Sequence, residues 1–311
     1  MKDLESCNLC EWRCNVNRQK GQHGICGIGI PQIATSMLHP APPASYDAFL
    51  LGCNFRCLGC QNYTTSMLHE HGTYISPQRW AEQADAALAS LEAKEMGADR
   101  LFFTGGEPTC SLPWVEAVAE WSTAPINFDT NGFMTTPSLE RVLSISDSVT
   151  FDIKAVTPGI HRLLTGTPVE PVLRNCTYII EHAPEKIYEF RVVVYPHLVE
   201  EAKKIAAFLV QISEDAPLHF IGFRPNFVLD SLRGASLQEM HEAVSFAQST
   251  GLHHVTWSGI PDISGLAGSK DKDIYEHLSL LAGCRKSGEN RACTCAWEEC
   301  PLRTYTPVRR T

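Results

Sequence analysis

Short apolar runs alternate with longer amphipathic stretches along the chain from about residue 47. The runs are rich in aliphatic and aromatic residues, as the buried strands of a parallel sheet are. They cover residues 48–51, 101–103, 126–128, 149–153, 190–194 and 218–222. The sequence therefore predicts six parallel strands, joined by connections long enough to hold helices.

The connecting stretches carry helix signals. In the first of them, Ser76 can cap a helix, Pro77 suits its first position and Gly97 can end it. Its apolar face would consist of Trp80, Ala84, Ala87, Leu88 and Leu91. Further helices are predicted near residues 113–121, 137–144, 172–182, 198–212 and 236–249.

Repeated strand–helix units imply either a βα barrel or a doubly wound sheet. In both folds the functional residues gather at the carboxyl ends of the strands. The proline-rich residues 40–43 and a Gly/Ser/Lys/Asp stretch near residue 265 mark the boundaries. We therefore expect an N-terminal segment over residues 1–44, a central α/β domain over 45–262 and a C-terminal segment over 263–311.

Composition narrows the class of protein. The 311 residues are 44% apolar and 20% charged, so the chain can bury a substantial core. Its formal net charge of −9 disfavours attraction to nucleic acid or to acidic membranes. It has neither an 18-residue apolar run nor the apolar stretch of a signal peptide. We expect a cytoplasmic protein whose 13 cysteines are metal ligands or reactive thiols rather than disulfides.

The most informative cysteines directly follow the first predicted strand. Cys53, Cys57 and Cys60 have the spacing C-x3-C-x2-C. Three thiolates this close can hold three irons of a four-iron cluster and leave the fourth iron without a protein ligand. An open metal position can bind a substrate, so the spacing indicates a catalytic metal site. The alternative is a structural zinc site with a distant fourth ligand.

Glycine and charged residues follow the other strands. Gly105, Gly106 and Glu107 come after the second strand, and Asp129 lies at the end of the third. Asp152 and Lys154 interrupt the end of the fourth strand. Charged residues at the end of a buried strand are costly unless they are paired or solvated or bind a ligand. Arg191 lies in the fifth. A ligand site at the strand ends would explain these residues, as would solvated or salt-bridged ends.

The cysteine motif, the Gly-Gly-Glu-Pro segment at 105–108 and the alternating strands together resemble the radical S-adenosylmethionine (radical SAM) superfamily over residues 45–260. The resemblance implies a partial (β/α)6 barrel of the TIM type and a [4Fe-4S] cluster on Cys53, Cys57 and Cys60. It also implies S-adenosylmethionine on the open iron and an electron donor of flavodoxin or ferredoxin type. Reductive cleavage would give a 5′-deoxyadenosyl radical that abstracts hydrogen from a substrate.

The segments at 129–133 and 152–154 more closely resemble the activating enzymes of glycyl-radical enzymes, typified by pyruvate formate-lyase activating enzyme. The roles that this resemblance implies concern S-adenosylmethionine and a monovalent cation. The methionine end of S-adenosylmethionine would be lined by Gly105, Gly106 and Glu107, and its polar end by Asp152 and Lys154. Arg191 would be a further polar contact, and Phe55 and Asn62 would flank the cluster and the adenine. The cation site would be matched by Asp129, Thr130, Asp152 and the Thr150 carbonyl.

Two outer cysteine blocks suggest auxiliary metal sites. The N-terminal block contains Cys7, Cys10, Cys14 and Cys26, and the C-terminal block contains Cys284, Cys293, Cys295 and Cys300. Each block could hold zinc, iron or a second cluster, and the two could also combine, since spacing does not separate these alternatives. Reactive thiols are the other interpretation of the C-terminal block. The isolated Cys110 and Cys176 have the pattern of small buried thiols.

Two functions follow from these features. The first is an activase-like enzyme that abstracts hydrogen from a protein or peptide. The alternative is a radical SAM enzyme that modifies a small molecule or nucleotide with the help of auxiliary metal sites. Specificity is expected from the loops near residues 61–75, 155–171 and 223–234 and from the C-terminal segment.

Overall fold

The computed structural model describes residues 2–259, and in them all six predicted strands are present. They are β2 (Ser45–Leu50), β3 (Arg100–Gly105), β4 (Ile126–Thr130), β5 (Ser148–Asp152), β6 (Ile187–Val194) and β7 (Leu218–Gly222). Each pairs in parallel with the next, so their carboxyl ends lie along one edge of the sheet. Mixed α/β structure with this strand order fits the predicted partial barrel.

Two further strands extend the sheet at its edges and were not predicted. β1 (Ile33–His39) pairs antiparallel with β2, and β8 (Val255–Ser258) pairs in parallel with β7. The sheet runs in the order β1 to β8 and does not close on itself. Most residues of these two strands are only half-buried, so neither strand forms an apolar run. β1 belongs to residues 1–44, and that segment therefore contributes to the sheet.

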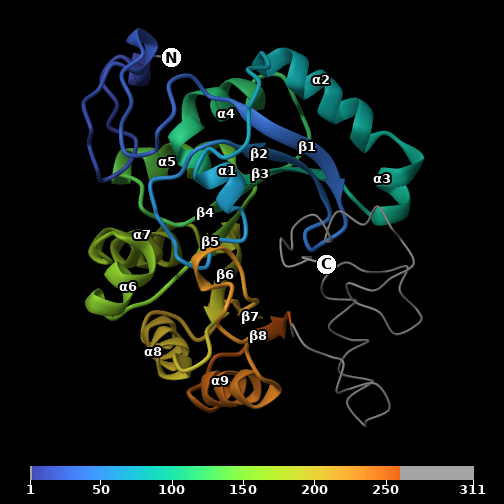
Figure 1. Cartoon of the computed structure of the whole chain (residues 1–311). Coiled ribbons are helices and arrows are strands. Elements are labelled where there is room, and N and C mark those ends of the chain that lie inside the picture. Colours follow the sequence, from blue (N-terminus) through green and yellow to red (C-terminus); the bar gives the residue numbers. More distant parts are fainter. Residues whose placement is uncertain (1, 260–311) are drawn as a thin grey trace.

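Helices follow the strands along one side of the curved sheet (Figure 1). Those at predicted positions are α2 (Pro77–Leu88), α4 (Leu112–Ala119), α5 (Thr136–Ile145), α7 (Glu170–His182), α8 (Val199–Val210) and α9 (Leu237–Ser249). Two short helices were not predicted, α1 (Tyr63–Ser66) and α6 (Pro158–Thr165). The 3-10 helices are η1 (Lys2–Leu4), η2 (Arg18–Lys20), η3 (Pro108–Ser111), η4 (Pro184–Lys186) and η5 (Phe227–Leu229).

The prediction of one continuous helix from Ser76 to Gly97 was wrong. The chain leaves the helix after Leu88 and starts α3 (Leu91–Met96), because the Ser90 side chain accepts a hydrogen bond from the Ala93 amide and caps a new helix. Leu91, assigned to the apolar face, is 79% exposed as a result. Gly97 ends α3 with a left-handed φ of 72°, as predicted.

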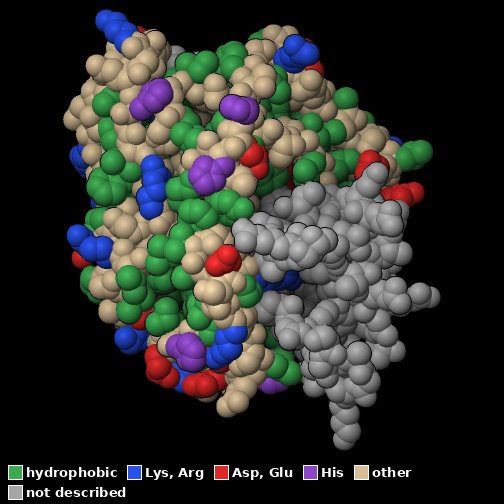
Figure 2. All heavy atoms as spheres, viewed as in Figure 1, with side chains coloured by type: hydrophobic (Ala, Val, Ile, Leu, Met, Phe, Trp, Pro, Cys, Tyr) green, Lys and Arg blue, Asp and Glu red, His purple; other side chains and the backbone are tan. Residues whose placement is uncertain are grey.

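The core lies between the sheet and these helices. Near its β1 end, Trp80 of α2, Trp114 of α4 and Phe103 of β3 pack with ring centroids 5.4, 5.5 and 6.2 Å apart. Within residues 2–259, the helices are all too short or too polar to cross a membrane. On the face in Figure 2, Lys and Arg side chains are scattered among hydrophobic and polar ones.

Candidate active site

The loop that carries the central cysteines leaves the carboxyl end of β2. Its backbone is fixed by the end of α6, where the Arg56 amide donates to the Thr165 carbonyl at 2.8 Å and the Leu58 amide to the Leu164 carbonyl at 3.0 Å. Cys53 is buried, whereas Cys57 and Cys60 are half-buried. The unpredicted helix α6 therefore supports the cysteine loop.

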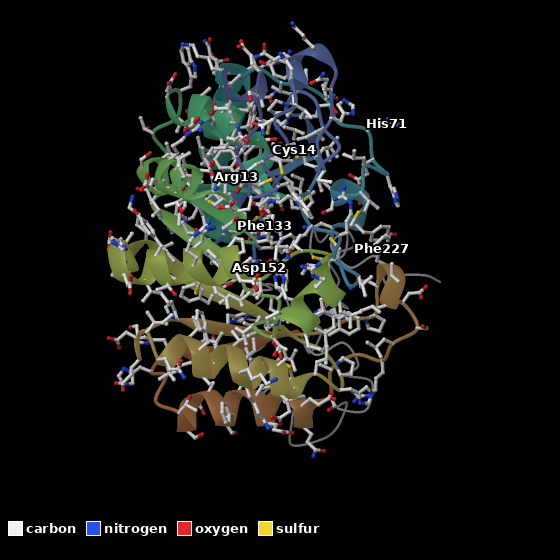
Figure 3. All side chains as sticks on the ribbon, turned by 90° about the vertical axis from the view of Figure 1, so that its left-hand side faces the viewer. Arg13, Cys14, His71, Phe133, Asp152 and Phe227 are labelled. Atoms are coloured by element: carbon white, nitrogen blue, oxygen red, sulfur yellow. The ribbon has the colours of Figure 1, made fainter. Side chains whose placement is uncertain are left out.

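The three thiols open onto a cavity of about 170 Å³ at the carboxyl edge of the sheet. Every residue predicted to contact the central cluster or S-adenosylmethionine lines this one cavity: Cys53, Cys57, Cys60, Gly105, Gly106, Glu107, Asp129, Asp152, Lys154 and Arg191. Phe55, Asn62 and Thr130 line it as well. Figure 3 shows Asp152 within this region of the molecule, at the end of β5.

Burial makes the three cavity thiols hard to ionise without a cation. It raises the pKa of Cys57 to about 12, although the nearby Lys154 charge lowers it. Burial also raises the pKa of Cys53 and of Cys60. A bound metal would favour the thiolates, because metal ligation requires deprotonated sulfur.

Glu107 ties two of the strand-end loops together. Its carboxylate accepts hydrogen bonds from the Thr109 amide and hydroxyl at 3.1 and 2.5 Å, the Thr130 hydroxyl at 2.8 Å and the Asn131 amide at 2.8 Å. Burial nevertheless raises the pKa of Glu107 to about 7, against the effect of these donors. Because both of its oxygens already have protein donors, Glu107 supports the cavity wall.

Four charged side chains, those of Asp129, Asp152, Lys154 and Arg191, line another part of the cavity, and Glu189 pairs with Arg191 beside them. The Lys154 ammonium lies 2.7 Å from Asp152 Oδ2, and the Arg191 guanidinium lies 3.5 Å from Asp129 Oδ1 and 2.9 Å from Glu189. Burial raises the pKa of Asp129 to about 6, although Arg191 lowers it. Burial disfavours the Lys154 charge, but Asp152 holds the pKa of that lysine above its ordinary value.

Two carboxylate oxygens of this group lack a hydrogen bond, although the Arg191 guanidinium lies 3.5 Å from one of them, Asp129 Oδ1. Asp129 Oδ1 and Asp152 Oδ1 are buried and have no hydrogen-bond partner within the described part of the chain. Buried acceptors are normally satisfied, so Asp152 Oδ1 in particular calls for a donor or a cation. The cavity can therefore receive a positively charged group beside Asp129 and Asp152.

Gly105 and Gly106 are required by the protein's own backbone. Gly105 adopts a left-handed φ of 100°. A Cβ at Gly106 would lie 2.0 Å from the carbonyl oxygen of Gly52, and the Glu107 amide donates to that same carbonyl at 2.9 Å. The start of the cysteine loop thus lies directly against the end of β3, and these glycines leave the room for it.

Several cavity residues were missed by the sequence analysis. Asn131 donates to Asn54 Oδ1 at 2.8 Å, and its amide nitrogen lies 3.8 Å from Cys53 Sγ. Tyr195 and Phe223 stack with centroids 4.7 Å apart and form an apolar wall. The last two follow β6 and β7 directly, and that position was the signal that could have identified them.

The N-terminal cysteine segment packs against the central cysteine loop. The Trp12 indole donates to the Asn54 carbonyl at 2.8 Å, and Trp12 also contacts Phe133 at 5.8 Å between centroids. Phe133 in turn packs on Phe55 at 5.5 Å. Cys14 belongs to the same segment and lies above Phe133 and Asp152 in Figure 3.

The isolated Cys110 does not behave as a lone buried thiol. Its thiol packs with that of Cys26 in a small buried cluster, and the interaction of the two thiols lowers the pKa of Cys26 and raises that of Cys110. Burial and the neighbouring thiols of Cys26 and Cys14 raise the pKa of Cys10 to about 12. Cys7 Sγ lies 3.8 Å from the Arg18 guanidinium. Cys284, Cys293, Cys295 and Cys300 lie outside the described residues.

The sequence matches the family model of the radical SAM superfamily over residues 49–209. A pyruvate formate-lyase-activating enzyme from Streptococcus mutans is 26% identical over 201 residues, which are 58% of this chain and 73% of that protein. An uncharacterized protein of Methanocaldococcus jannaschii, MJ0674, is 26% identical over 160 residues, 49% of this chain and 46% of its own. The chain thus spans about half the length of MJ0674.

Among solved structures, Streptococcus suis SuiB bound to the precursor peptide SuiA is similar, with a TM-score of 0.51 and 14% identity. The likeness covers 74% of this chain and 49% of SuiB. At this level of identity it supports the fold alone.

Proposed function

The chain belongs to the radical SAM superfamily, and on that basis we propose that it cleaves S-adenosylmethionine reductively and abstracts hydrogen from a protein or peptide. In this proposal Cys53, Cys57 and Cys60 hold the [4Fe-4S] cluster that the family implies. The observation that carries it is the common cavity, which is lined both by these thiols and by the charged ends of β4, β5 and β6. An electron donor of flavodoxin or ferredoxin type would supply the electron.

The residues around the cavity fit the two groups chemically. Thiolates are the ligands that iron–sulfur clusters use. The Lys154 ammonium suits a carboxylate, and the oxygens of Asp129 and Asp152 that lack a hydrogen bond suit an amino group or a cation. When bound, the cluster and S-adenosylmethionine together supply the one-electron cleavage of a carbon–sulfur bond.

The protein's own contribution would be position, charge and exclusion of water. Asp152 orients the Lys154 ammonium, while Glu107 fixes the loop of Asn131. The stacked rings of Tyr195 and Phe223 cover one wall with apolar surface. A dry wall protects a reactive species from water.

We also propose a monovalent cation between Asp129 and Asp152. The support for it is that Asp129 Oδ1 and Asp152 Oδ1 both lack a hydrogen bond in the described chain and that the two carboxylates bring like charge together. Thr130 and the Thr150 carbonyl would complete the site. This site would hold the charged end of the cavity in a fixed geometry.

A protein or peptide is the substrate class that we favour. The named relative from Streptococcus mutans is an enzyme that activates another enzyme. The alternative is a small molecule or nucleotide processed with the help of auxiliary metal sites, which rests on the outer cysteines.

Deuterium transfer separates these substrate classes. Cells of the source organism are grown in heavy water, and their extract is divided by ultrafiltration into macromolecules and small molecules. The reduced enzyme then receives each fraction with unlabelled S-adenosylmethionine. We expect deuterium in the 5′-deoxyadenosine only with the macromolecular fraction. Deuterium arriving only from the small-molecule fraction would overturn the proposed substrate class.

Replacing Lys154 by glutamine should weaken binding of S-adenosylmethionine. A charge-assisted hydrogen bond contributes about 1.5–3 kcal/mol, so the Kd is expected to rise by roughly 10- to 100-fold. Titration calorimetry on the cluster-loaded protein measures this change. Lys94→Gln, on the exposed surface of α3, is the matched control and should leave Kd unchanged. Equal affinity in the Lys154→Gln and Lys94→Gln variants would contradict the assigned contact.

A further inference from the structure

A second group of thiols lies behind the central cysteine loop, and one of its members comes from outside the N-terminal segment. Cys10 lies near Cys14 and Cys26, and Cys26 packs with Cys110 of η3 in one buried cluster. Cys110 also lies near Cys10. These four residues form a connected group, which we call the rear thiol group.

A buried cation faces the rear thiol group. Arg18 is only 2% exposed, and its Nη1 donates to the Cys110 carbonyl at 2.7 Å. Its charge acts on the Cys26 thiol. Its Nη2 atom is buried and has no acceptor among residues 2–259. A buried guanidinium with an unused donor is costly unless an anionic acceptor meets it.

A second unused donor lies on the other side of the group. The Asn54 side chain is next to the Cys10 sulfur, but its buried Nδ2 atom has no acceptor at hydrogen-bond distance in the described chain. Hydrogen bonds to cluster sulfurs are a regular feature of protein iron–sulfur sites. Arg18 and Asn54 thus present two free donors to one set of four thiols.

We propose that Cys10, Cys14, Cys26 and Cys110 hold a second iron–sulfur cluster of the four-iron type, with Arg18 and Asn54 donating hydrogen bonds to its sulfurs. Four cysteine thiolates are the complete ligand set of such a cluster, so it would have no open iron. The guanidinium offsets the negative charge that four thiolates bring into a buried place. This inference concerns a site separate from the proposed reaction and stands without it.

The unused donors of Arg18 and Asn54 favour a cluster over a single zinc ion. A cluster adds sulfides that can accept hydrogen bonds from both side chains, whereas a zinc ion adds no acceptor beyond the four thiolates.

Cys110 takes the place that the sequence pattern gave to Cys7. The C-x2-C-x3-C spacing suggested Cys7, Cys10 and Cys14 as partners of Cys26. In the structure Cys7 contacts Arg18, whereas Cys110 contacts Cys26 directly. The site therefore joins the N-terminal segment to the loop that follows Gly105 and Gly106.

Iron and acid-labile sulfide content of the anaerobically reconstituted full chain tests this assignment without any activity assay. Cys110→Ala and Cys14→Ala should each lose about four irons and four sulfides per chain relative to Cys176→Ala. Cys176 is the matched control, because it is fully buried in α7 and burial alone shifts its pKa. Cys7→Ala should retain the iron that Cys110→Ala loses.

The same comparison in a Cys53/Cys57/Cys60 triple-alanine background isolates the second cluster. There the remaining electron paramagnetic resonance signal of the reduced protein should lose the same component with Cys110→Ala and with Cys14→Ala. Because Cys14 is half-buried, its variant still tests the site if the Cys110 variant fails to fold. Iron retained in the Cys110 and Cys14 variants, or zinc without sulfide at these cysteines, overturns the proposal. The proposal would also be overturned if the Cys7→Ala variant lost this iron and the Cys110→Ala variant retained it.

Discussion

Replacing Cys57 by alanine is expected to abolish the formation of 5′-deoxyadenosine from S-adenosylmethionine. Two remaining thiols cannot hold three irons of a cluster. Changes to residues that merely orient a metal ligand already cost 10- to 100-fold in affinity or activity, so loss of a ligand should cost more than about 100-fold. Chromatographic quantification of 5′-deoxyadenosine after reduction with dithionite measures the effect, with iron content determined on the same sample.

The matched control for this variant is Cys176→Ala. Both changes remove one thiol, but Cys176 is packed in the core of α7, away from the cavity. It should retain the wild-type rate and iron content. A Cys57→Ala protein that still makes 5′-deoxyadenosine near the wild-type rate would show that this thiol is not a ligand.

Replacing Gly106 by alanine is expected to destabilise the protein and loosen the cysteine loop together. The new Cβ would lie 2.0 Å from the Gly52 carbonyl oxygen and 2.6 Å from its carbon, and backbone cannot move aside as a flexible side chain can. Overpacking against backbone costs about 3 kcal/mol, which lowers the midpoint of thermal unfolding by roughly 6–10 °C. Circular dichroism melts measure the shift, and iron content should fall in parallel.

Gly159→Ala is the control for this substitution. Gly159 lies in the first turn of α6, and a Cβ there would meet no described residue within 4 Å. Alanine is favoured over glycine in a helix by up to about 1 kcal/mol, so this variant should be unchanged or slightly more stable. Equal melting midpoints for the Gly106→Ala and Gly159→Ala variants would contradict the close packing of β3 on the cysteine loop.

The sequence was sufficient for the central strands and for most cavity residues. Buried parallel strands leave continuous apolar runs, and each motif stands directly after such a run, as Gly105 and Asp152 do. Parallel strands bring their carboxyl ends to one edge of the sheet. A residue's place directly after a strand therefore predicted its place in the cavity. The edge strands β1 and β8 were missed because half-buried residues dilute the apolar pattern.

Contacts between segments that are distant along the chain could not be predicted from the sequence. Nothing in the pattern around Glu107 indicates that Thr130 and Asn131 use its oxygens. The contact of Cys110 with Cys26 likewise depends on how the N-terminal segment packs on the cysteine loop. One helix boundary was also missed. The Ser90 cap starts a second helix, although the apolar pattern continues through this position.

The amount of 5′-deoxyadenosine that the reduced, cluster-reconstituted full chain makes from S-adenosylmethionine tests the proposed reductive cleavage most directly. We expect this product from the wild-type protein and from Cys176→Ala, and none above background from the Cys53/Cys57/Cys60 triple-alanine variant. No product from wild-type protein with a full iron complement, under conditions in which another radical SAM enzyme is active, would contradict the proposed cleavage.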